Sequence, residues 1–412
     1  MWSVVLSSVA VFLVVILILV AVLLLARKKL VPQGKVKLQI NGEKTLEVDT
    51  GNSLLSTLAS QKIFLPSACG GKGSCGLCRC RVTEGGGSIL PSEKGFFSYR
   101  EQQQDWRLGC QVKVKGDMSV QIPPEVFGVR KWECEVVSNH NVATFIKEFV
   151  VKLPEGENLN FKAGGYIQID VPACTVNYKD IVVEDEYKAD WDRMKMWDLV
   201  MKNPEPCFRA YSMANHPAEG NRIMLNVRIA TPPFDRKKGG FMNVNPGICS
   251  SYIYSLKPGD KITISGPYGE FFVQDTRREM MFIGGGAGMA PMRSQIFDQF
   301  KTKHTDRKAS FWYGGRSLKE LFYMDEYEAL AKEHPNFSFH VALSEPLPED
   351  NWTGDTGFIH QVIFNKYLKN HPEPEEIEYY LCGPKPMTDA VVRMLDSLGV
   401  PPEMIRYDNF GN

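Results

Sequence analysis

The cysteine-rich segment at residues 66–80, PSACGGKGSCGLCRC, constrains this chain more than any other stretch. It places four cysteines and four glycines in fifteen positions. Thiols at that density usually hold a metal ion, an iron–sulfur cluster or a disulfide, and each of these is typical of a different class of protein. Which of the three is present decides what the chain can do.

The spacing of these cysteines favours a [2Fe–2S] cluster. Structural zinc sites usually pair C-x2-C with a second C-x2-C or with two histidines, and here Cys75 and Cys78 form such a pair alone. Plant-type clusters use C-x4-C-x2-C and a distant fourth cysteine. The chain matches that pattern, with one extra loop residue, at Cys69, Cys75, Cys78 and Cys110. Cys80 is the alternative fourth ligand, and we predict that Cys110 is the ligand instead.

An apolar run lies near the N-terminus. Residues 4–26 contain no charged side chain, and as a helix they would span roughly 34 Å, enough to cross a bilayer core. A cleavable signal peptide is the alternative, but no basic residue precedes the run, which exceeds the usual ~7–15 apolar residues. Arg27, Lys28 and Lys29 follow at once. The positive-inside rule therefore predicts a single-pass anchor that contacts lipid through residues 4–26 and leaves residues 27–412 in the reducing cytoplasm.

Length and charge indicate several soluble-type domains behind this anchor. A chain of 412 residues is long enough for two or three. Its 48 basic and 48 acidic residues leave no net charge, which argues against a nucleic-acid partner. Residues 1–31 are assigned to the anchor. Residues 32–127, with a hairpin at an Asn-Gly turn, a helix within residues 53–65 and further strands, predict an α+β ferredoxin-like domain.

Two further domains follow from the change in hydrophobic period. Recurring short β-rich runs at residues 128–274 predict an antiparallel β-barrel, and strand–helix alternation at residues 275–412 predicts a doubly wound parallel sheet. An aromatic-rich insertion at residues 174–207 interrupts the barrel. Ordinary packing of an inserted helix is the favoured interpretation, and a partner-docking face is the alternative. The side chains in question are Trp191, Met194, Met196 and Trp197.

Four short motifs in these two domains suggest nucleotide binding. The first is R-x-Y-S at residues 209–212, which alone is weak. The second, G-x-C-S at residues 247–250, opens a predicted helix whose N–H groups could face a pyrophosphate. The third, GGGAGMAP at residues 284–291, follows an apolar strand, the setting of a dinucleotide-phosphate turn. The fourth is C-G-P at residues 382–384, at the end of a predicted parallel strand.

In this order the motifs resemble those of the ferredoxin–NADP⁺ reductase superfamily. The complete sequence of modules, together with the C-x5-C spacing and the terminal YDNFGN, resembles the family of F subunits of the sodium-translocating NADH:quinone reductases. That resemblance implies an inner-membrane protein with other membrane subunits as partners. It implies transfer of a hydride from NADH to FAD, and of single electrons through the [2Fe–2S] cluster to the next carrier.

The resemblance also implies roles for individual residues on the flavin. Arg209 would neutralise the FAD pyrophosphate, Tyr211 would pack on the isoalloxazine and Ser212 would hydrogen-bond near its N5. The helix start would bind the diphosphate through Gly247, Cys249 and Ser250. Phe410 would cover the flavin face, although it is third from the end of the chain.

Further roles concern NADH. Its phosphates would approach the backbone in the glycine motif, through Gly284, Gly286, Gly288 and Pro291. Cys382 and Gly383 would lie beside the nicotinamide, and Arg316 would pair with a phosphate. Ser212, Cys382 and Phe410 are the expected catalytic residues. NADH rather than NADPH rests on the resemblance alone.

Two alternatives remain open at this point. The reductase component of an oxygenase system uses the same three modules. A membrane-tethered zinc-binding interaction protein, with glycine loops that are only structural, belongs to a different class altogether.

Overall fold

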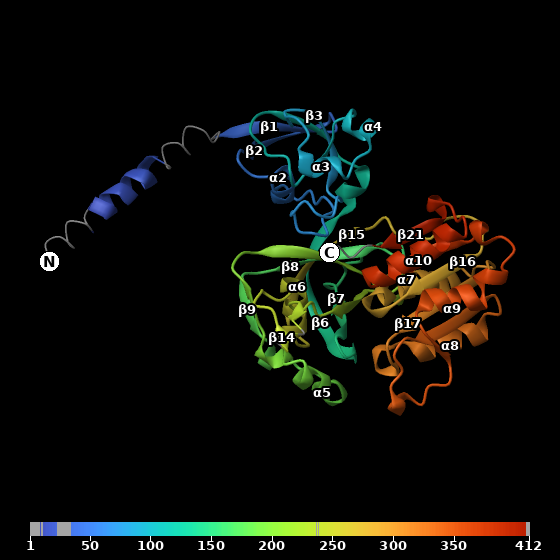
Figure 1. Ribbon diagram of the computed structural model, residues 1–412. Coiled ribbons are helices and arrows are strands. Elements are labelled where there is room, and N and C mark those ends of the chain that lie inside the picture. The colour runs from blue at the N-terminus through green and yellow to red at the C-terminus, as the bar shows by residue number, and fades with distance from the viewer. Residues whose placement is uncertain (1–8, 10, 23–33, 236, 238, 409–412) are drawn as a thin grey trace. The chain divides into compact units, whose positions relative to one another are not determined.

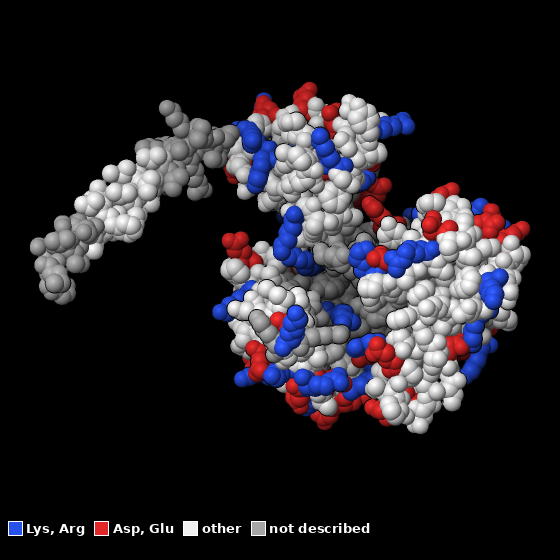
Figure 2. All heavy atoms as spheres, viewed as in Figure 1, with Lys and Arg blue, Asp and Glu red and all other residues white. Residues whose placement is uncertain are grey.

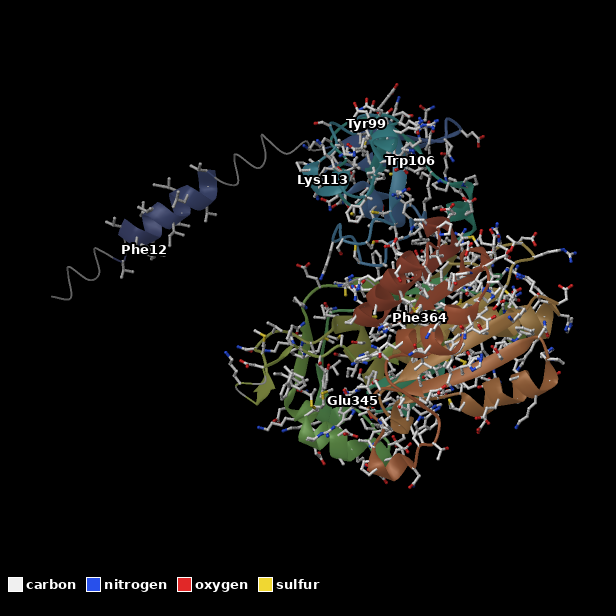
Figure 3. The ribbon with its side chains drawn as sticks, turned by 45° about the vertical axis from the view of Figure 1, so that its right-hand side comes forward. Phe12, Tyr99, Trp106, Lys113, Glu345 and Phe364 are labelled. Atoms are coloured by element: carbon white, nitrogen blue, oxygen red, sulfur yellow. The ribbon has the colours of Figure 1, made fainter. Side chains whose placement is uncertain are left out.

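The computed structural model describes residues 9, 11–22, 34–235, 237 and 239–408, and it divides the chain into two compact units, Met1–Val129 and Arg130–Asn412 (Figure 1). Residues 11–22 are helical and carry exposed apolar side chains, among them Phe12 (Figure 3). Figure 2 shows no charged side chain on this described stretch. Within the described residues, no helix has both the length and the apolar character that a membrane span requires. The rest of the predicted anchor, residues 4–8, 10 and 23–26, lies outside them.

The first unit is built on a five-stranded sheet with the order β2-β1-β5-β3-β4. Its hairpin turns through Asn41, Gly42 and Glu43, between the paired residues Ile40 and Lys44, and Asn41 and Gly42 both have positive φ. This confirms the predicted hairpin. The strands are β1 (Lys35–Ile40), β2 (Lys44–Asp49), β3 (Arg79–Glu84), β4 (Trp106–Leu108) and β5 (Met118–Gln121). The helical elements are α2 (Leu54–Ser60), α3 (Pro91–Lys94), α4 (Tyr99–Gln102) and the 3₁₀ turn η1 (Pro124–Gly128).

Helix α2 is shorter than its apolar spacing predicts. Ser53 caps it by accepting a hydrogen bond from the Ser56 N–H, but the helix ends at Ser60 rather than near Leu65. Lys62 adopts a left-handed conformation with φ 61°, which stops the helix. Ile63 and Leu65 are still buried. The apolar pattern there reflects a packed loop that leads into the cysteine segment.

The second unit begins with an antiparallel sheet of order β11-β8-β15-β6-β7-β12. Its edge strands meet through a bridge between Met213 and Leu225 and a 2.7 Å hydrogen bond from Ala214 N to Met224 O. This contact closes the sheet into the predicted barrel. The strands are β6 (Arg130–Ala143), β7 (Ile146–Lys152), β8 (Tyr166–Val171), β11 (Cys207–Ser212), β12 (Arg222–Arg228) and β15 (Lys261–Tyr268). Helix α6 (Ile248–Ser255) contacts β8 and β12.

The insertion folds onto this barrel. It contains β9 (Cys174–Asn177), the turn η2 (Tyr178–Asp180), α5 (Asp185–Arg193), the turn η3 (Met196–Asp198) and β10 (Val200–Asn203). Trp191 and Met196 are fully buried in the barrel core, and Met194 and Trp197 pack against it. The favoured interpretation of an inserted, packed helix is therefore confirmed for these side chains. A further hairpin, β13 (Phe234–Asp235) with β14 (Gly240–Phe241), lies between β12 and α6 in the chain.

The unit ends in the predicted parallel sheet, of order β19-β18-β17-β16-β20-β21. Its strands are β16 (Met280–Gly284), β17 (Ala309–Gly315), β18 (Phe337–Leu343), β19 (Asp355–Thr356), β20 (Glu378–Cys382) and β21 (Ile405–Asp408). The core on one face includes side chains of α7 (Met289–Phe297) and α8 (Met324–Glu333), and the core on the other includes those of α9 (Ile359–Lys366) and α10 (Lys385–Ser397) (Figure 1). The strand order reverses between β16 and β20, where such sheets bind nucleotides beyond the carboxyl ends of the strands.

Candidate functional site

Four cysteines of the first unit lie as two pairs. The sulfurs of Cys69 and Cys75 are 3.4 Å apart, and Cys78 and Cys110 lie close enough for each thiol to shift the pKa of the other. Cys69 and Cys75 are partly exposed, whereas Cys78 is buried. The pairs thus combine three cysteines of the predicted loop with one from the segment after β4.

The glycines of the loop are needed for its backbone path. Gly70, Gly71, Gly73 and Gly76 all have positive φ, between 66° and 83°, a region that glycine adopts without a steric cost. A Cβ on Gly76 would also lie 2.5 Å from the Phe96 ring. The loop can therefore keep its backbone close to whatever the thiols hold.

Cys80 has a different environment from the four paired thiols. It is fully buried on β3, and its sulfur lies 3.9 Å from the Arg107 carbonyl oxygen, to which the thiol donates. Burial raises the pKa of this thiol to about 12. Cys80 is therefore held as a neutral thiol against the neighbouring strand β4.

A buried ion pair lies beside Cys80. Glu93 and Arg107 are joined by a 2.8 Å contact, with side chains 0% and 6% exposed. The other oxygen of Glu93 accepts the Leu108 N–H at 2.9 Å, and the Gly109 N–H donates to the Cys78 carbonyl at 2.7 Å. The pair thus fixes the segment that carries Cys110 next to the segment that carries Cys78.

The donor set of the loop fits an iron–sulfur cluster. Among the described residues, no three His, Cys, Asp or Glu side chains converge as ligands of one metal ion would. A [2Fe–2S] cluster takes four cysteine thiolates, two on each iron. Two pairs of thiols, three from the glycine-rich loop and one from Cys110 after β4, match that requirement.

The predicted flavin residues meet where β11 faces α6. Burial raises the pKa of Tyr211 well above its ordinary value, and the nearby Cys249 thiol adds to that rise. Arg209 is close enough to both groups to affect their titration. The structure therefore brings Arg209, Tyr211 and Cys249 together, although they come from two separate motifs.

The start of α6 is held close to the barrel. Gly247 caps the helix, and a Cβ there would lie 2.5 Å from the Cβ of Ala230. The Ser250 hydroxyl accepts the Ala230 N–H and donates to the Gly247 carbonyl. The first-turn N–H groups of any helix lack intrahelical partners and suit an anionic ligand. The cradle therefore fits a pyrophosphate, with Ser250 supporting the helix start through contacts within the chain.

The glycine motif and the C-G-P motif lie side by side at the point where the strand order reverses. Gly284 and Cys382 are register partners on β16 and β20. A Cβ on Gly288 would lie 2.1 Å from the Cys382 carbonyl oxygen, and one on Gly383 would lie 2.5 Å from Met387. Gly286 has φ 56°. Because Gly288 and Gly383 are glycines, no side chain of these residues covers the backbone at the edge where a dinucleotide would bind.

The barrel and the parallel sheet meet at a polar contact beside this edge. The Ser212 hydroxyl donates a 2.7 Å hydrogen bond to Asp408 Oδ2, and the Cys382 thiol lies 3.8 Å from the Asp408 carbonyl oxygen. Burial raises the pKa of the Asp408 carboxyl, and the Ser212 hydrogen bond offsets part of that rise. Two of the expected catalytic residues, Ser212 and Cys382, are thus connected through Asp408.

Three other predicted residues are placed differently. Pro291 is buried within α7, away from solvent. Arg316 follows β17 with its side chain 62% exposed, 4.0 Å from Glu320. Phe410 lies outside the described residues. Its stacking on a flavin therefore stays a prediction.

Comparisons with known proteins agree with this arrangement. Models of three domain families match the chain: the 2Fe-2S iron-sulfur cluster binding domain at residues 38–115, the oxidoreductase FAD-binding domain at residues 195–273 and the oxidoreductase NAD-binding domain at residues 282–393. Similar curated proteins are the F subunits of the Na(+)-translocating NADH-quinone reductases of Marinomonas sp. (54% identical over 404 residues), Neisseria gonorrhoeae (56% over 404) and Klebsiella pneumoniae (56% over 406). Each alignment covers 98% of both chains.

The chain belongs to the family of F subunits of the Na(+)-translocating NADH-quinone reductases. Solved structures share its fold at lower identity. The Amycolatopsis cytochrome P450 reductase GcoB has a TM-score of 0.63 at 21% identity and covers 91% of this chain and 98% of its own. The ferredoxin reductase in carbazole 1,9a-dioxygenase has a TM-score of 0.58 at 24% identity and covers 92% and 99%.

Asp408 is the residue of this site that the sequence did not single out. It comes directly after Tyr407 in the terminal stretch YDNFGN, two positions before Phe410. If Phe410 is expected at the flavin, a carboxylate two residues earlier is expected near it as well. The position of Asp408 two residues before Phe410 is therefore the sequence feature that points to it.

Proposed function

We propose that this chain is the NADH-oxidising component of a sodium-pumping NADH:quinone reductase. It takes a hydride from NADH onto FAD and passes single electrons through its [2Fe–2S] cluster to the next carrier of the complex. The observation that carries this proposal is the contact of Ser212 with Asp408 beside Cys382. It joins the flavin barrel to the carboxyl edge of the nucleotide sheet, which is what direct transfer between two bound rings needs.

FAD supplies the chemistry that accepts two electrons at once and returns them singly. The side chains supply position. Arg209 and the start of α6 would bind the FAD diphosphate, and the glycine motif of residues 284–288 would let the NADH phosphates approach. Asp408, whose pKa is raised by burial, would hold the Ser212 hydroxyl in place by accepting its hydrogen bond. Cys382, fully buried, would exclude water beside the nicotinamide.

Cys69, Cys75, Cys78 and Cys110 would ligate the cluster. The pairing of Cys110 with Cys78, and of Cys80 with a backbone carbonyl, supports Cys110 as the fourth ligand. Two thiol pairs also favour a two-iron cluster over a zinc ion. The oxygenase-reductase alternative shares the fold, but identity above 50% over nearly the whole chain favours the quinone reductase.

The predicted membrane anchor concerns where in the cell this reaction takes place. Residues 4–26 would anchor the chain in the inner membrane, with residues 27–412 on the cytoplasmic side, where NADH is available. Other membrane subunits would take the electron and carry out quinone chemistry and sodium transport; the names of the relatives state that they are subunits of Na(+)-translocating NADH-quinone reductases. Separation of membranes from soluble extract, before and after removal of residues 1–31, tests the anchor directly.

Anaerobic mixing of the purified full-length protein with NADH tests the function. The flavin absorbance should bleach first and the cluster absorbance should follow. A protein that contains neither flavin nor iron, or a flavin that NADH leaves oxidised, would contradict the proposal.

A further inference from the structure

The insertion at residues 174–207 makes two contacts that packing alone does not require. Its core side chains complete the barrel interior, as Trp191 and Met196 show. It also reaches two elements of the proposed nucleotide sites, namely helix α6 and the turn η7 (Leu318–Glu320) that follows β17. Each contact uses a polar side chain of the insertion, so each has a defined geometry.

The first contact supports the helix start proposed for the FAD diphosphate. The hydroxyl of Tyr178, which is fully buried, lies 2.8 Å from the Ser251 hydroxyl. Ser251 in turn donates to the Gly247 carbonyl at 2.6 Å. The Trp191 ring stacks on Tyr254 of α6 at 6.2 Å. The insertion therefore holds α6 both at its first turn, through Ser251, and further along, at Tyr254.

The second contact crosses to the nucleotide domain. Asp190 of α5 forms a 2.6 Å ion pair with Lys319 of η7, and the two side chains are 20% and 29% exposed. The Lys319 ammonium also lies 5.5 Å from the centre of the Tyr187 ring. A partly buried pair with an aromatic neighbour is less screened than a surface pair. It can therefore hold the turn in place.

The held turn lies at the functional edge of the parallel sheet. β17 is the parallel neighbour of β16, whose end carries the glycine motif, and η7 begins just beyond the end of β17. Arg316, expected to meet a phosphate of NADH, precedes this turn and lies 4.0 Å from Glu320 within it. A shift of η7 would thus move the wall of the nucleotide site on the β17 side.

We infer that the insertion connects the FAD helix to the NADH site, and that Asp190 is a positioning residue for NADH binding. This inference rests on the proposed function of Arg316 and the parallel-sheet edge. Loss of the Asp190–Lys319 pair should weaken binding of the dinucleotide while it leaves the reacting groups, and hence the rate of hydride transfer at saturation, in place.

The test is rapid mixing of holoenzyme with a series of NADH concentrations while flavin bleaching is followed. For Asp190→Asn we expect the NADH concentration at half-maximal rate to rise about 5- to 10-fold, with the limiting rate within twofold of the parent. Asp185→Asn is the matched control, since Asp185 lies on the same helix, pairs with Lys188 and is 95% exposed. It should leave both quantities unchanged. Because Asp190 also contacts Arg193, Arg193→Ala serves as a second control with the same expectation.

A variant on the other side of the contact keeps the test independent of insertion folding. Lys319→Met should give the same rise, the double variant with Asp190→Asn should add nothing further, and the reversed pair Asp190→Lys with Lys319→Asp should recover part of the affinity. An unchanged NADH dependence in Lys319→Met, or equal loss in Asp185→Asn and Asp190→Asn, would overturn the inference. Failure of the proposed function has a different signature, because the parent protein itself would then not be bleached by NADH.

Discussion

The thiol site of the first unit and the Ser212–Asp408 site of the second differ in how the chain assembles them. Cys69 and Cys75 are six residues apart, and the glycines between them set the loop that holds them. Ser212 and Asp408 are 196 residues apart and meet only because the barrel packs against the end of the parallel sheet. The first site is encoded locally, with one buried ion pair to hold its distant member. The second exists only when a whole unit has folded.

The largest expected effect tests the local site. Cys110→Ala removes one thiol from the two pairs, so the cluster should not assemble, and iron and acid-labile sulfide should fall to background. Cys80→Ala should retain both, because Cys80 bonds to the Arg107 carbonyl instead. Bleaching of the flavin by NADH should persist in both variants. Loss of iron from Cys80→Ala with retention in Cys110→Ala would reverse the ligand assignment.

The next effect concerns the ion pair that secures Cys110. Glu93→Gln leaves the Arg107 guanidinium buried without its partner, and breaking such a pair typically costs about 3–5 kcal/mol. We expect the unfolding transition of the first unit to shift by that amount, measured in denaturant by the loss of cluster absorbance. The flavin signal of the second unit should not move. Glu101→Gln is the matched control, because its pair with Arg79 is solvent-exposed and should contribute little. Equal shifts in the two variants would contradict the assignment.

The assembled site is tested by Asp408→Asn. The amide weakens the charged hydrogen bond that fixes the Ser212 hydroxyl, so the limiting rate of flavin reduction by NADH should fall by up to roughly 100-fold, the cost of misplacing a group at the reacting centre. Iron content should stay at the level of the parent. Asp389→Asn, on α10 where the carboxylate pairs with Lys385, should have no effect. A rate unchanged by Asp408→Asn would remove Asp408 from the chemistry.

This difference also explains what the sequence could predict. The Asn41–Gly42 turn, the cysteine spacing and the strand–helix alternation are local patterns, and the structure has each of them. For Asp408 the only local signal is its nearness to Phe410, and its contact with Ser212, 196 positions away, matches no local pattern. Local sequence patterns therefore predict the thiol site of the first unit better than the Ser212–Asp408 contact of the second.

Local patterns also gave a wrong or an open prediction where tertiary packing determines the structure. The apolar spacing at residues 53–65 predicts a longer helix than the one that ends at Ser60, because Ile63 and Leu65 fill the core from a loop. The aromatic residues of the insertion left two interpretations open for the same reason. Only the fold shows that Trp191 lies inside the barrel, where its indole donates to the Thr144 carbonyl.

The smallest effect concerns Lys147, a fully buried ammonium on β7 that links the barrel to the insertion. It donates to the Val182 carbonyl at 2.7 Å and lies 5.2 Å from the centre of the Tyr254 ring. Burial lowers the pKa of Lys147 from 10.5 to about 8, and Glu184 offsets part of that shift. Between these two values the unfolded chain binds more protons than the folded one, so stability should rise with pH.

The expected rise is about 2 kcal/mol in the unfolding free energy of the second unit between pH 8 and pH 10. Other groups titrate in the same range, so the quantity to compare is the pH slope of the parent minus that of Lys147→Met, measured by denaturant unfolding followed through flavin release. Lys152→Met, at an exposed position at the end of the same strand, should keep the slope of the parent. If the parent and Lys147→Met have the same pH slope, burial does not lower the pKa of Lys147. The first unit, followed by its cluster, should show no difference between these three proteins, because Lys147 belongs to a site that only the folded second unit contains.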